Sequence, residues 1–346
     1  MLGPNSYGKS GIRLVKVTRR PDRHDLKDVT VAVRLEGDFE KAHVAGDNSA
    51  VLPTDTMKNA VYALAGETSL EQIESFGLVL ARHFVESHAP VSRARVEISE
   101  HLWERLDVSG RPHRHAYRRA GEETRLARIA LDRGSEPSVD AGIENLLILK
   151  TAQSSFAGFP RDRYTTLKET GDRILATALS AVWSYGEEGV FFNLLWRGVR
   201  QTLLETFADH DSKSVQHTLH AMGEAVLERH AEVRQIRLTM PNKHHLPADL
   251  TPFGFANENA IFVATEEPYG VIEATVVRAS TDSRVHQERS RQDSRTRTDQ
   301  LNKRSVVALD WSGAIRPVGR IWMAEVNGGE ILQLKPLASR EAAKEQ

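Results

Sequence analysis

Apolar and polar residues alternate along the first part of the chain. Residues 11–20 (GIRLVKVTRR) and residues 27–38 (KDVTVAVRLEGD) show this period of two, which predicts half-buried strands. A turn around Pro21 and Asp22 lies between them. We therefore expect the chain to begin with a β-hairpin.

Apolar residues at helical spacing follow this hairpin, and alternation then returns. Two helices and then two strands are predicted, over residues 54–65, 69–88, 92–106 and about 113–131. Thr54 and Asp55 open the first helix, and Ser69 is placed to cap the second. Ser109 and Gly110 mark the turn between the two strands. The first half of the chain is thus predicted to be β-β-α-α-β-β.

The same order recurs after a breaker-rich segment at residues 133–137. The predicted elements are strands over 143–152 and 173–185, helices over 190–208 and 212–230, and strands over 234–246 and 259–278. This duplication predicts an α+β protein with tandem domains over residues 1–136 and 137–280. Each domain would be an antiparallel four-stranded sheet with helices on one face. Because such sheets leave their edges open, we expect oligomerisation into a closed, ring-like barrel.

The end of the chain has a different composition. Residues 281–304 contain almost no apolar side chains and many Arg, Ser and Asp residues, which predicts a flexible polar linker. Residues 305–346 contain short strand-like runs separated by glycine turns. An RNase H-like domain often begins with such a meander, but about 40 residues cannot form that domain alone. We interpret this segment as a short β-rich appendage whose role the sequence leaves open.

Composition and charge exclude several classes of protein. The 346 residues are 40% apolar and 27% charged with a formal net charge of −1, so no basic field points to nucleic acid or to an anionic membrane. The chain has no cysteine, which excludes disulfides, thiolate catalysis and cysteine-ligated metal sites. We find no apolar run with a length of about 18 residues and no apolar signal region at the N-terminus. These features predict a cytoplasmic protein with no membrane partner.

The most informative motif is residues 153–173, QSSFAGFPRDRYTTLKETGDR, between two strand-like runs. Phe156 precedes Ala157 and Gly158, so its ring can be presented with little steric cover. Arg173 offers a planar fork that suits bidentate recognition of an acyl or anionic edge. A flat, ring-shaped, anionic ligand fits both residues.

Other motifs stand at predicted element ends. Lys9 lies just before the first strand, and Thr54 lies at a helix N-terminus, where an anion is favoured. Val215 and Gln216 lie in the first turn of another helix. Taken singly, each has an ordinary interpretation, because a helix-opening threonine is usually a cap and an isolated lysine is usually solvated.

Histidines cluster at two places in the sequence. Alternation late in a strand would put Asn242 and His244 on one face and Lys243 and His245 on the other. The pairs His113/His115 and His244/His245 invite interpretation as metal ligands, yet no carboxylate stands at a convincing spacing. We therefore predict no metal site.

In order and spacing, these motifs closely resemble the urate oxidase (uricase) family. The resemblance runs from Tyr7 to Arg278 and rests on the segments YGK, TDTMKN, FAGFPRDRYTTLKETGDRIL, SVQ and MPNKHHL. It implies the tunnelling fold (T-fold), with its tandem domains closing into a barrel in a homotetramer. It also implies oxidation of urate by dioxygen and water to 5-hydroxyisourate and hydrogen peroxide, without a cofactor.

The resemblance also implies roles for individual residues. Phe156 stacks on the purine, Arg173 and Gln216 hold its polar edge, and the Val215 backbone N–H adds a contact. Asn242 holds dioxygen or water above the ring. The remaining roles concern a subunit interface and a proton relay: Thr54 and Asp55 contact the ligand from a neighbouring subunit, and Lys9, Thr54 and His244 form the relay.

Two departures and two alternatives accompany this resemblance. Residues 186–189 differ from the family's expected loop, and residues 281–346 have no counterpart in it. One alternative is another purine- or pterin-handling T-fold enzyme, although the zinc-dependent ones need Cys/His ligands that are missing here. The other is a catalytically inactive purine-binding scaffold protein, against which the intact set of Lys9, Thr54 and His244 argues.

Overall fold

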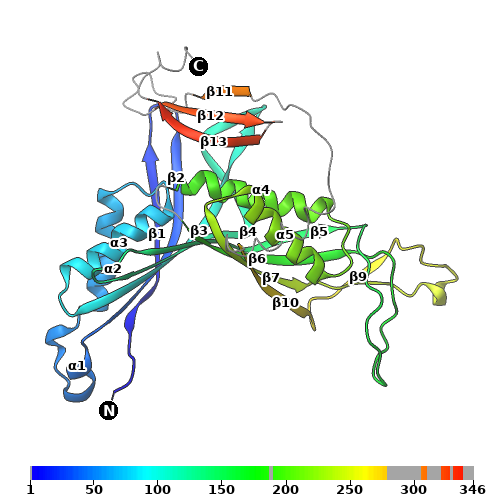
Figure 1. Cartoon of the computed structure of the whole chain (residues 1–346), viewed down its shortest axis with the longest axis horizontal. Coiled ribbons are helices and arrows are strands. Elements are labelled where there is room, and N and C mark those ends of the chain that lie inside the picture. The colour runs from blue at the N-terminus through cyan, green and yellow to red at the C-terminus, as the bar shows by residue number, and fades with distance from the viewer. Residues whose placement is uncertain (1, 187–189, 279–304, 310–320, 328–329, 338–346) are drawn as a thin grey trace, which may run out of the picture. The chain divides into compact units, whose positions relative to one another are not determined.

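The computed structural model describes residues 2–186, 190–278, 305–309, 321–327 and 330–337. The chain separates into two compact units, Met1–Arg278 and Ala279–Gln346. The first unit is an α+β structure built on one antiparallel sheet of eight strands (Figure 1). The predicted fold class, an antiparallel sheet with helices, is therefore confirmed at this level.

The strands of the large sheet lie in the order β1-β2-β3-β4-β5-β6-β7-β10. Their bounds are β1 Tyr7–Arg19, β2 His24–Gly37, β3 Val91–Val108, β4 Arg111–Asp132, β5 Ser138–Lys150, β6 Leu175–Tyr185, β7 Val233–Asn242 and β10 Gly270–Val277. Strand β4 pairs antiparallel with β5, from Thr124 opposite Glu144 to Ala130 opposite Ser138. The two predicted four-stranded sheets are thus joined into one.

Helices cover the sheet in two groups (Figure 1). The longer helices are α2 Thr54–Glu67, α3 Ile73–Ser87, α4 Phe192–Asp209 and α5 Val215–Arg229; the short elements are α1 Glu40–Ala45 and the 3-10 turns η1 Asn48–Ala50 and η2 Thr251–Phe253. Alternate residues of β2, including Val29, Val31 and Val33, are fully buried against α2 and α3 in one core. A second core gathers residues of β6, β7, α4 and α5.

The observed element order agrees with the predicted repeat of β-β-α-α-β-β, with short additional elements. The last predicted strand, 259–278, is divided into β9 Phe262–Ala264 and β10. Strand β9 pairs with β8 His245–Pro247 in a separate two-stranded sheet. The two cores lie on either side of residue 136, where we divided the domains, and that division stays a prediction.

Two local predictions are wrong. Lys9 lies inside β1 and pairs with Val33, not before the strand, because β1 continues through a register shift between Lys9 and Ile12. Gly11 in this shift has φ 70°, a left-handed conformation that glycine adopts without steric cost. Ser69 does not cap α3, because Gln72 holds the N-cap position.

A buried polar seam joins the two halves on the helical side. Arg125 donates from Nη2 to both oxygens of Glu74, at 2.8 and 2.6 Å, and from Nη1 to Asn193 Oδ1 at 2.6 Å. Its guanidinium carbon also lies 5.3 Å from the Trp196 ring centroid. Glu74 is fully buried, so the pair satisfies charges that would be costly to bury alone. The seam therefore fixes the start of α3 and of α4 against β4.

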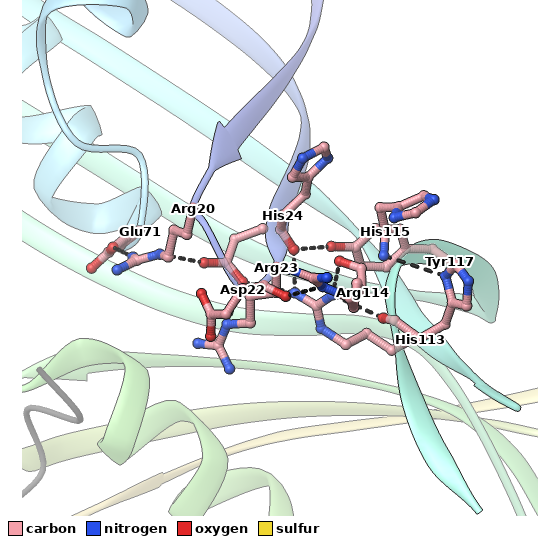
Figure 2. Close-up of polar contacts among 11 residues, drawn as sticks. Arg20, Asp22, Arg23, His24, Glu71, His113, Arg114, His115 and Tyr117 are labelled. Atoms are coloured by element: carbon pink, nitrogen blue, oxygen red, sulfur yellow. Dashed lines mark hydrogen bonds and ion pairs between the residues drawn. The ribbon is translucent and has the colours of Figure 1, made fainter. Parts of the chain in front are cut away.

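A second polar cluster braces the β1–β2 turn against β4 (Figure 2). Arg114 donates from Nε and Nη2 to the carbonyl oxygens of Asp22 and Pro21, at 2.5 and 2.6 Å. The Tyr117 hydroxyl and the Arg105 guanidinium both donate to the His24 carbonyl oxygen.

His113 and His115 lie within this cluster, with their ring centroids 4.6 Å apart (Figure 2). Within the described ranges, no group of three or more His, Asp or Glu side chains could hold a metal ion. No helix in the same ranges is long and apolar enough to cross a membrane.

The second unit contains a three-stranded antiparallel sheet in the order β11-β12-β13. Its strands are β11 Ser305–Leu309, β12 Ile321–Asn327 and β13 Glu330–Leu337, which confirms the strand-like runs predicted in this region. The predicted linker over 281–304 and residues 187–189 of the β6–α4 connection lie outside the described residues.

Candidate active site

A cavity of about 480 Å³ opens where the β5–β6 loop, the start of α5 and the end of β7 meet. The sequence-predicted residues of the second half of the chain all line it: Phe156, Arg173, Val215, Gln216, Asn242 and His244. The structure thus brings together side chains from three separate segments. Their roles stay predictions.

A second cavity, of about 500 Å³, lies on the helix-free face of the large sheet. Its lining includes Arg128, Asp140, Arg237 and several hydroxyl groups. None of the residues predicted from the motifs lies in it, and its opposed charges can satisfy one another. The cavity around Phe156 is therefore the candidate site.

The β5–β6 loop folds back on itself at Phe156. The Phe156 N–H donates to the Thr170 carbonyl oxygen at 2.9 Å, and the Thr170 N–H donates back to Phe156 at 3.0 Å. Gly158, with φ 73°, allows the chain to turn between them. This pairing brings the Phe156 ring beside Arg173, whose guanidinium carbon lies 5.1 Å from the ring centroid. The Phe159 ring stacks on Phe156 at 4.9 Å and 16°.

Arg173 presents an unneutralised charge to the cavity. Its side chain is half-buried, and burial lowers the pKa of the guanidinium below its ordinary value. Among the described residues, no acceptor reaches its buried Nε and no carboxylate forms an ion pair with it. An anion would supply the partner that Arg173 lacks.

Asp172 organises this loop, and the motifs did not single it out. Its Oδ1 accepts from the Ser154 and Arg173 N–H groups, each at 3.1 Å, and its carbonyl oxygen accepts from Thr170 Oγ1 at 2.7 Å. One carboxylate oxygen thus links the segment leading to Phe156 with the backbone of Arg173. The available signal was an aspartate directly before the arginine, in a loop where Asp commonly bonds nearby backbone.

We expect Asp172→Ala to raise KM for the ligand about threefold to tenfold, because each lost loop hydrogen bond contributes about 0.5–1.5 kcal/mol. Asp172→Asn should stay close to wild type, since its side-chain oxygen can still accept both N–H groups. Steady-state kinetics of the two variants decide the point. Equal KM values for Asp172→Ala and wild type would contradict a positioning role.

The start of α5 is fastened to the same loop. Ser155 N–H donates to the Ser212 carbonyl oxygen at 2.8 Å, and Ser212 N–H donates to Gln153 at 2.9 Å. Ser214 caps the helix by accepting from the His217 N–H at 3.1 Å. Val215 and Gln216 therefore occupy the first turn, as predicted, where unsatisfied backbone N–H groups favour an anion.

Asn242 and His244 reach the cavity by a different route from the predicted one. Strand β7 ends at Asn242, so strand alternation does not set the direction of His244. Asn242 Nδ2 lies 3.4 Å from His244 Nδ1. The His244 carbonyl oxygen accepts from Thr265 N–H at 2.9 Å. The predicted opposite face for His245 is also wrong, because His245 lines the same cavity.

Lys9 lies in β1, and Thr54 and Asp55 open α2. Figure 1 shows both elements at the other half of the sheet. None of these three residues lines the cavity around Phe156. Pro53 holds the N-cap position of α2 with no side-chain cap, so Thr54 is the first helical residue and not the cap. The Asp55 carboxylate bonds Lys58 at 2.5 Å, and this contact, with a smaller contribution from the Lys9 charge, lowers its pKa.

Gly8 explains why Lys9 can sit so close to its neighbouring strand. A Cβ at Gly8 would come within 1.9 Å of the Val33 carbonyl oxygen, so a larger residue would displace β1 from β2. The Lys9 charge acts on the Asp55 carboxylate, so Lys9 lies near the start of α2. One chain therefore carries two partial groups of the predicted residues.

The fold and the cavity define a class: an α+β protein whose antiparallel sheet carries an aromatic site with an unpaired arginine. The uricase family model matches residues 5–130 and 139–273. The chain belongs to the uricase family.

Named relatives agree with this assignment. The uricase of Arthrobacter globiformis is 47% identical over 278 residues, which cover 80% of this chain and 90% of that relative. The uricase of Dictyostelium discoideum is 36% identical over 278 residues, covering 80% and 96%.

Solved structures show the same arrangement of the chain. The crystal structure of the uricase from Arthrobacter globiformis matches with a TM-score of 0.77 at 46% identity, covering 81% of this chain and 96% of that chain. The urate oxidase from Bacillus sp. TB-90 matches with a TM-score of 0.71 at 22% identity, covering 79% and 100%, and shares the fold. The family match ends at residue 273, before the second compact unit.

Proposed function

We propose that this protein oxidises urate with dioxygen and water to 5-hydroxyisourate and hydrogen peroxide, without a metal ion or a flavin. The observation that carries the proposal is the cavity in which an unpaired Arg173 stands beside the Phe156 ring. A planar purine anion matches both the ring and the charge. Membership of the uricase family supports the same substrate.

In this proposal the cavity orients the purine. The ring stacks on Phe156, while Arg173 and Gln216 bond its polar edge and the Val215 backbone N–H adds a further contact. Because Asp172 and Ser212 hold both loops, these groups are arranged before the ligand arrives. Such preorganisation lowers the entropy cost of reaching the reactive geometry.

The reaction asks the protein for proton transfers and for exclusion of bulk water. Deprotonated urate is electron-rich enough to pass electrons to dioxygen, and water then adds to the oxidised ring. We propose that Asn242 holds dioxygen or water above the ring and that Lys9, Thr54 and His244 relay protons. An amine, a hydroxyl and an imidazole can together pass protons with little reorganisation.

The separation of Lys9, Thr54 and Asp55 from the cavity supports a site completed between subunits. We propose tandem T-fold domains whose sheets close into a barrel in a homotetramer, with Thr54 and Asp55 of one subunit facing the cavity of another. The edge strands β1 and β10 each have one partner strand in the described chain, so both edges are open for pairing. The cytoplasmic location stays a prediction.

The direct test is a urate assay on the purified full-length protein. We expect loss of urate absorbance, uptake of dioxygen and formation of hydrogen peroxide in equal amounts, unchanged by a chelator. Activity that is lost with the chelator and restored by a metal ion would contradict the cofactor-free proposal. Failure to consume urate would favour the inactive purine-binding alternative.

We expect a chain ending at Ser280 to keep its activity and its oligomeric state. The family match ends at residue 273 and the compact unit at Arg278, so the proposed site lies entirely before the cut. Sedimentation and urate turnover of the truncated and full chains, measured side by side, check this. Dissociation together with loss of turnover would mean that residues 281–346 belong to the assembly.

A further inference from the structure

Two histidines that none of the predicted site motifs includes are hydrogen-bonded to each other beside the cavity. His210 Nε2 lies 3.0 Å from His217 Nδ1, and their ring centroids are 4.3 Å apart. His210 caps the C-terminal end of α4, where its N–H donates to the Thr206 carbonyl oxygen at 3.0 Å. His217 lies in the first turns of α5.

The surrounding backbone decides which ring donates. Lys213 N–H donates to the same His217 Nδ1 at 3.4 Å, and a backbone N–H can only donate. His217 Nδ1 is therefore the acceptor, and His210 Nε2–H is the donor. The contact survives one proton added at the far nitrogen of His210. It cannot survive a proton on His217 Nδ1, which would face two donors.

The surroundings of His210 favour its neutral ring. Burial first, and then the charges of His217, Lys150 and Lys213, lower the pKa of His210, while Asp211 opposes them. Lys150 at the end of β5 donates to the His210 carbonyl oxygen and also faces Asp172. Lys213 is paired with Asp211 at 2.6 Å.

The pair spans the segment that carries part of the cavity wall. In the sequence, Ser212 and the turn with Val215 and Gln216 lie between the two histidines. Ser212 is hydrogen-bonded to the Phe156 loop through Ser155 and Gln153. Closing the pair therefore ties the end of α4 to the start of α5 across this segment.

We propose that the His210–His217 hydrogen bond is a proton-sensitive positioning contact, which holds the Val215–Gln216 turn against the Phe156 loop and opens when His217 Nδ1 takes up a proton. This rests on the proposed function in one respect, namely that the turn binds urate. In the described part of the chain the two histidine rings bond each other and the Lys213 N–H, and no relay residue, so they act on substrate binding and not on the chemical step.

The sign of the pH effect follows from the shared acceptor, because a proton on His217 Nδ1 removes the lone pair to which His210 and Lys213 donate. The lowered pKa of His210 acts in the same direction. A histidine that is harder to protonate in the folded protein than in the unfolded chain stabilises the fold while it is neutral. That contribution is present above the ordinary histidine pKa of about 6.5 and is lost as the pH falls below it. Substrate affinity should decline over the same acidic range.

The test compares KM for urate in wild type, His217→Ala, His217→Asn and the control His220→Asn between pH 8 and pH 5.5. His220 lies on the same helix, and its ion-pair partner among the described residues is Glu224. At pH 8 we expect KM of His217→Ala to be about twofold to tenfold higher than KM of wild type. At pH 5.5 the ratio of these two KM values should be about one. Taking the ratio of two KM values at the same pH removes the pH effects that variant and wild type share.

The other variants sharpen the outcome. His217→Asn keeps an acceptor that does not titrate. The ratio of its KM to that of wild type should therefore be about one at pH 8 and below one at pH 5.5. His220→Asn should match wild type throughout, and kcat should be unchanged in all variants. A His217→Ala ratio of one at pH 8, or one that stays constant with pH, would overturn the proposal. If His217→Ala does not fold, His217→Asn decides alone.

Amide hydrogen exchange of residues 208–218 in the unliganded protein tests the contact without urate. After correction for the intrinsic exchange rate, wild-type protection should fall on acidification, and His217→Ala should be less protected than wild type at pH 8 and match it at acidic pH. Equal protection in the two proteins at pH 8 would refute the contact. Should the wild type consume no urate, the proposed function fails, and the exchange result still decides the histidine pair.

Discussion

Replacing Lys9 with methionine is expected to lower kcat for urate by about 10²- to 10⁴-fold, the usual contribution of a positioned proton-transfer group. Methionine keeps the length of the side chain and removes its proton. Thr54→Ala should act similarly, because Thr54 at the start of α2 and Lys9 in β1 are proposed to serve the same proton relay. KM should change much less than kcat in both variants, as measured by steady-state kinetics.

The double variant tests whether the two residues act together. Groups in one proton relay are strongly non-additive, so Lys9→Met with Thr54→Ala should be about as slow as the slower single variant. Lys16→Met is the matched control, since Lys16 lies on the same strand and bonds the carbonyl oxygens of Ala65 and Thr68. Independent multiplication of the two losses, or an equal loss of kcat in the control, would refute a shared relay.

Arg173→Ala is expected to raise KM for urate about 30-fold to 1000-fold, which corresponds to about 2–4 kcal/mol of lost binding. The guanidinium has a buried Nε without a partner and no ion pair among the described residues, so its charge is available to the ligand. Loss of a bidentate charged contact also leaves ligand acceptors unpaired. Steady-state kinetics, supported by direct binding of a non-reactive purine, measure the effect.

Arg163→Ala provides the control for this substitution. Arg163 belongs to the same loop but is exposed, stacks over the Tyr164 ring at 4.5 Å and does not line the cavity. Its loss should leave KM unchanged. An unchanged KM for Arg173→Ala would mean that Arg173 acts only as a surface charge, and an equal rise in both variants would point to a general effect on the loop.

Sequence patterns located most of the candidate site because its residues stand in short, chemically distinctive segments. Phe156 and Arg173 share one loop, and Val215 and Gln216 share one helical turn. The patterns missed Asp172, because its importance comes from the two backbone N–H groups that fold onto one of its oxygens. They also missed His210 and His217, which stand seven residues apart and meet only because a helix ends and another begins between them.

The sequence by itself determined the order of strands and helices and the loop that carries Phe156, because periodicity, caps and turns act over a few residues. Only the tertiary structure decided that β4 pairs with β5 and joins the halves into one sheet, since this register depends on contacts between distant segments. It likewise decided that Lys9 lies within β1, through the shift at Gly11. Finally, it separated Lys9 and Thr54 from the Phe156 cavity, because the two groups lie against different cores of the same sheet.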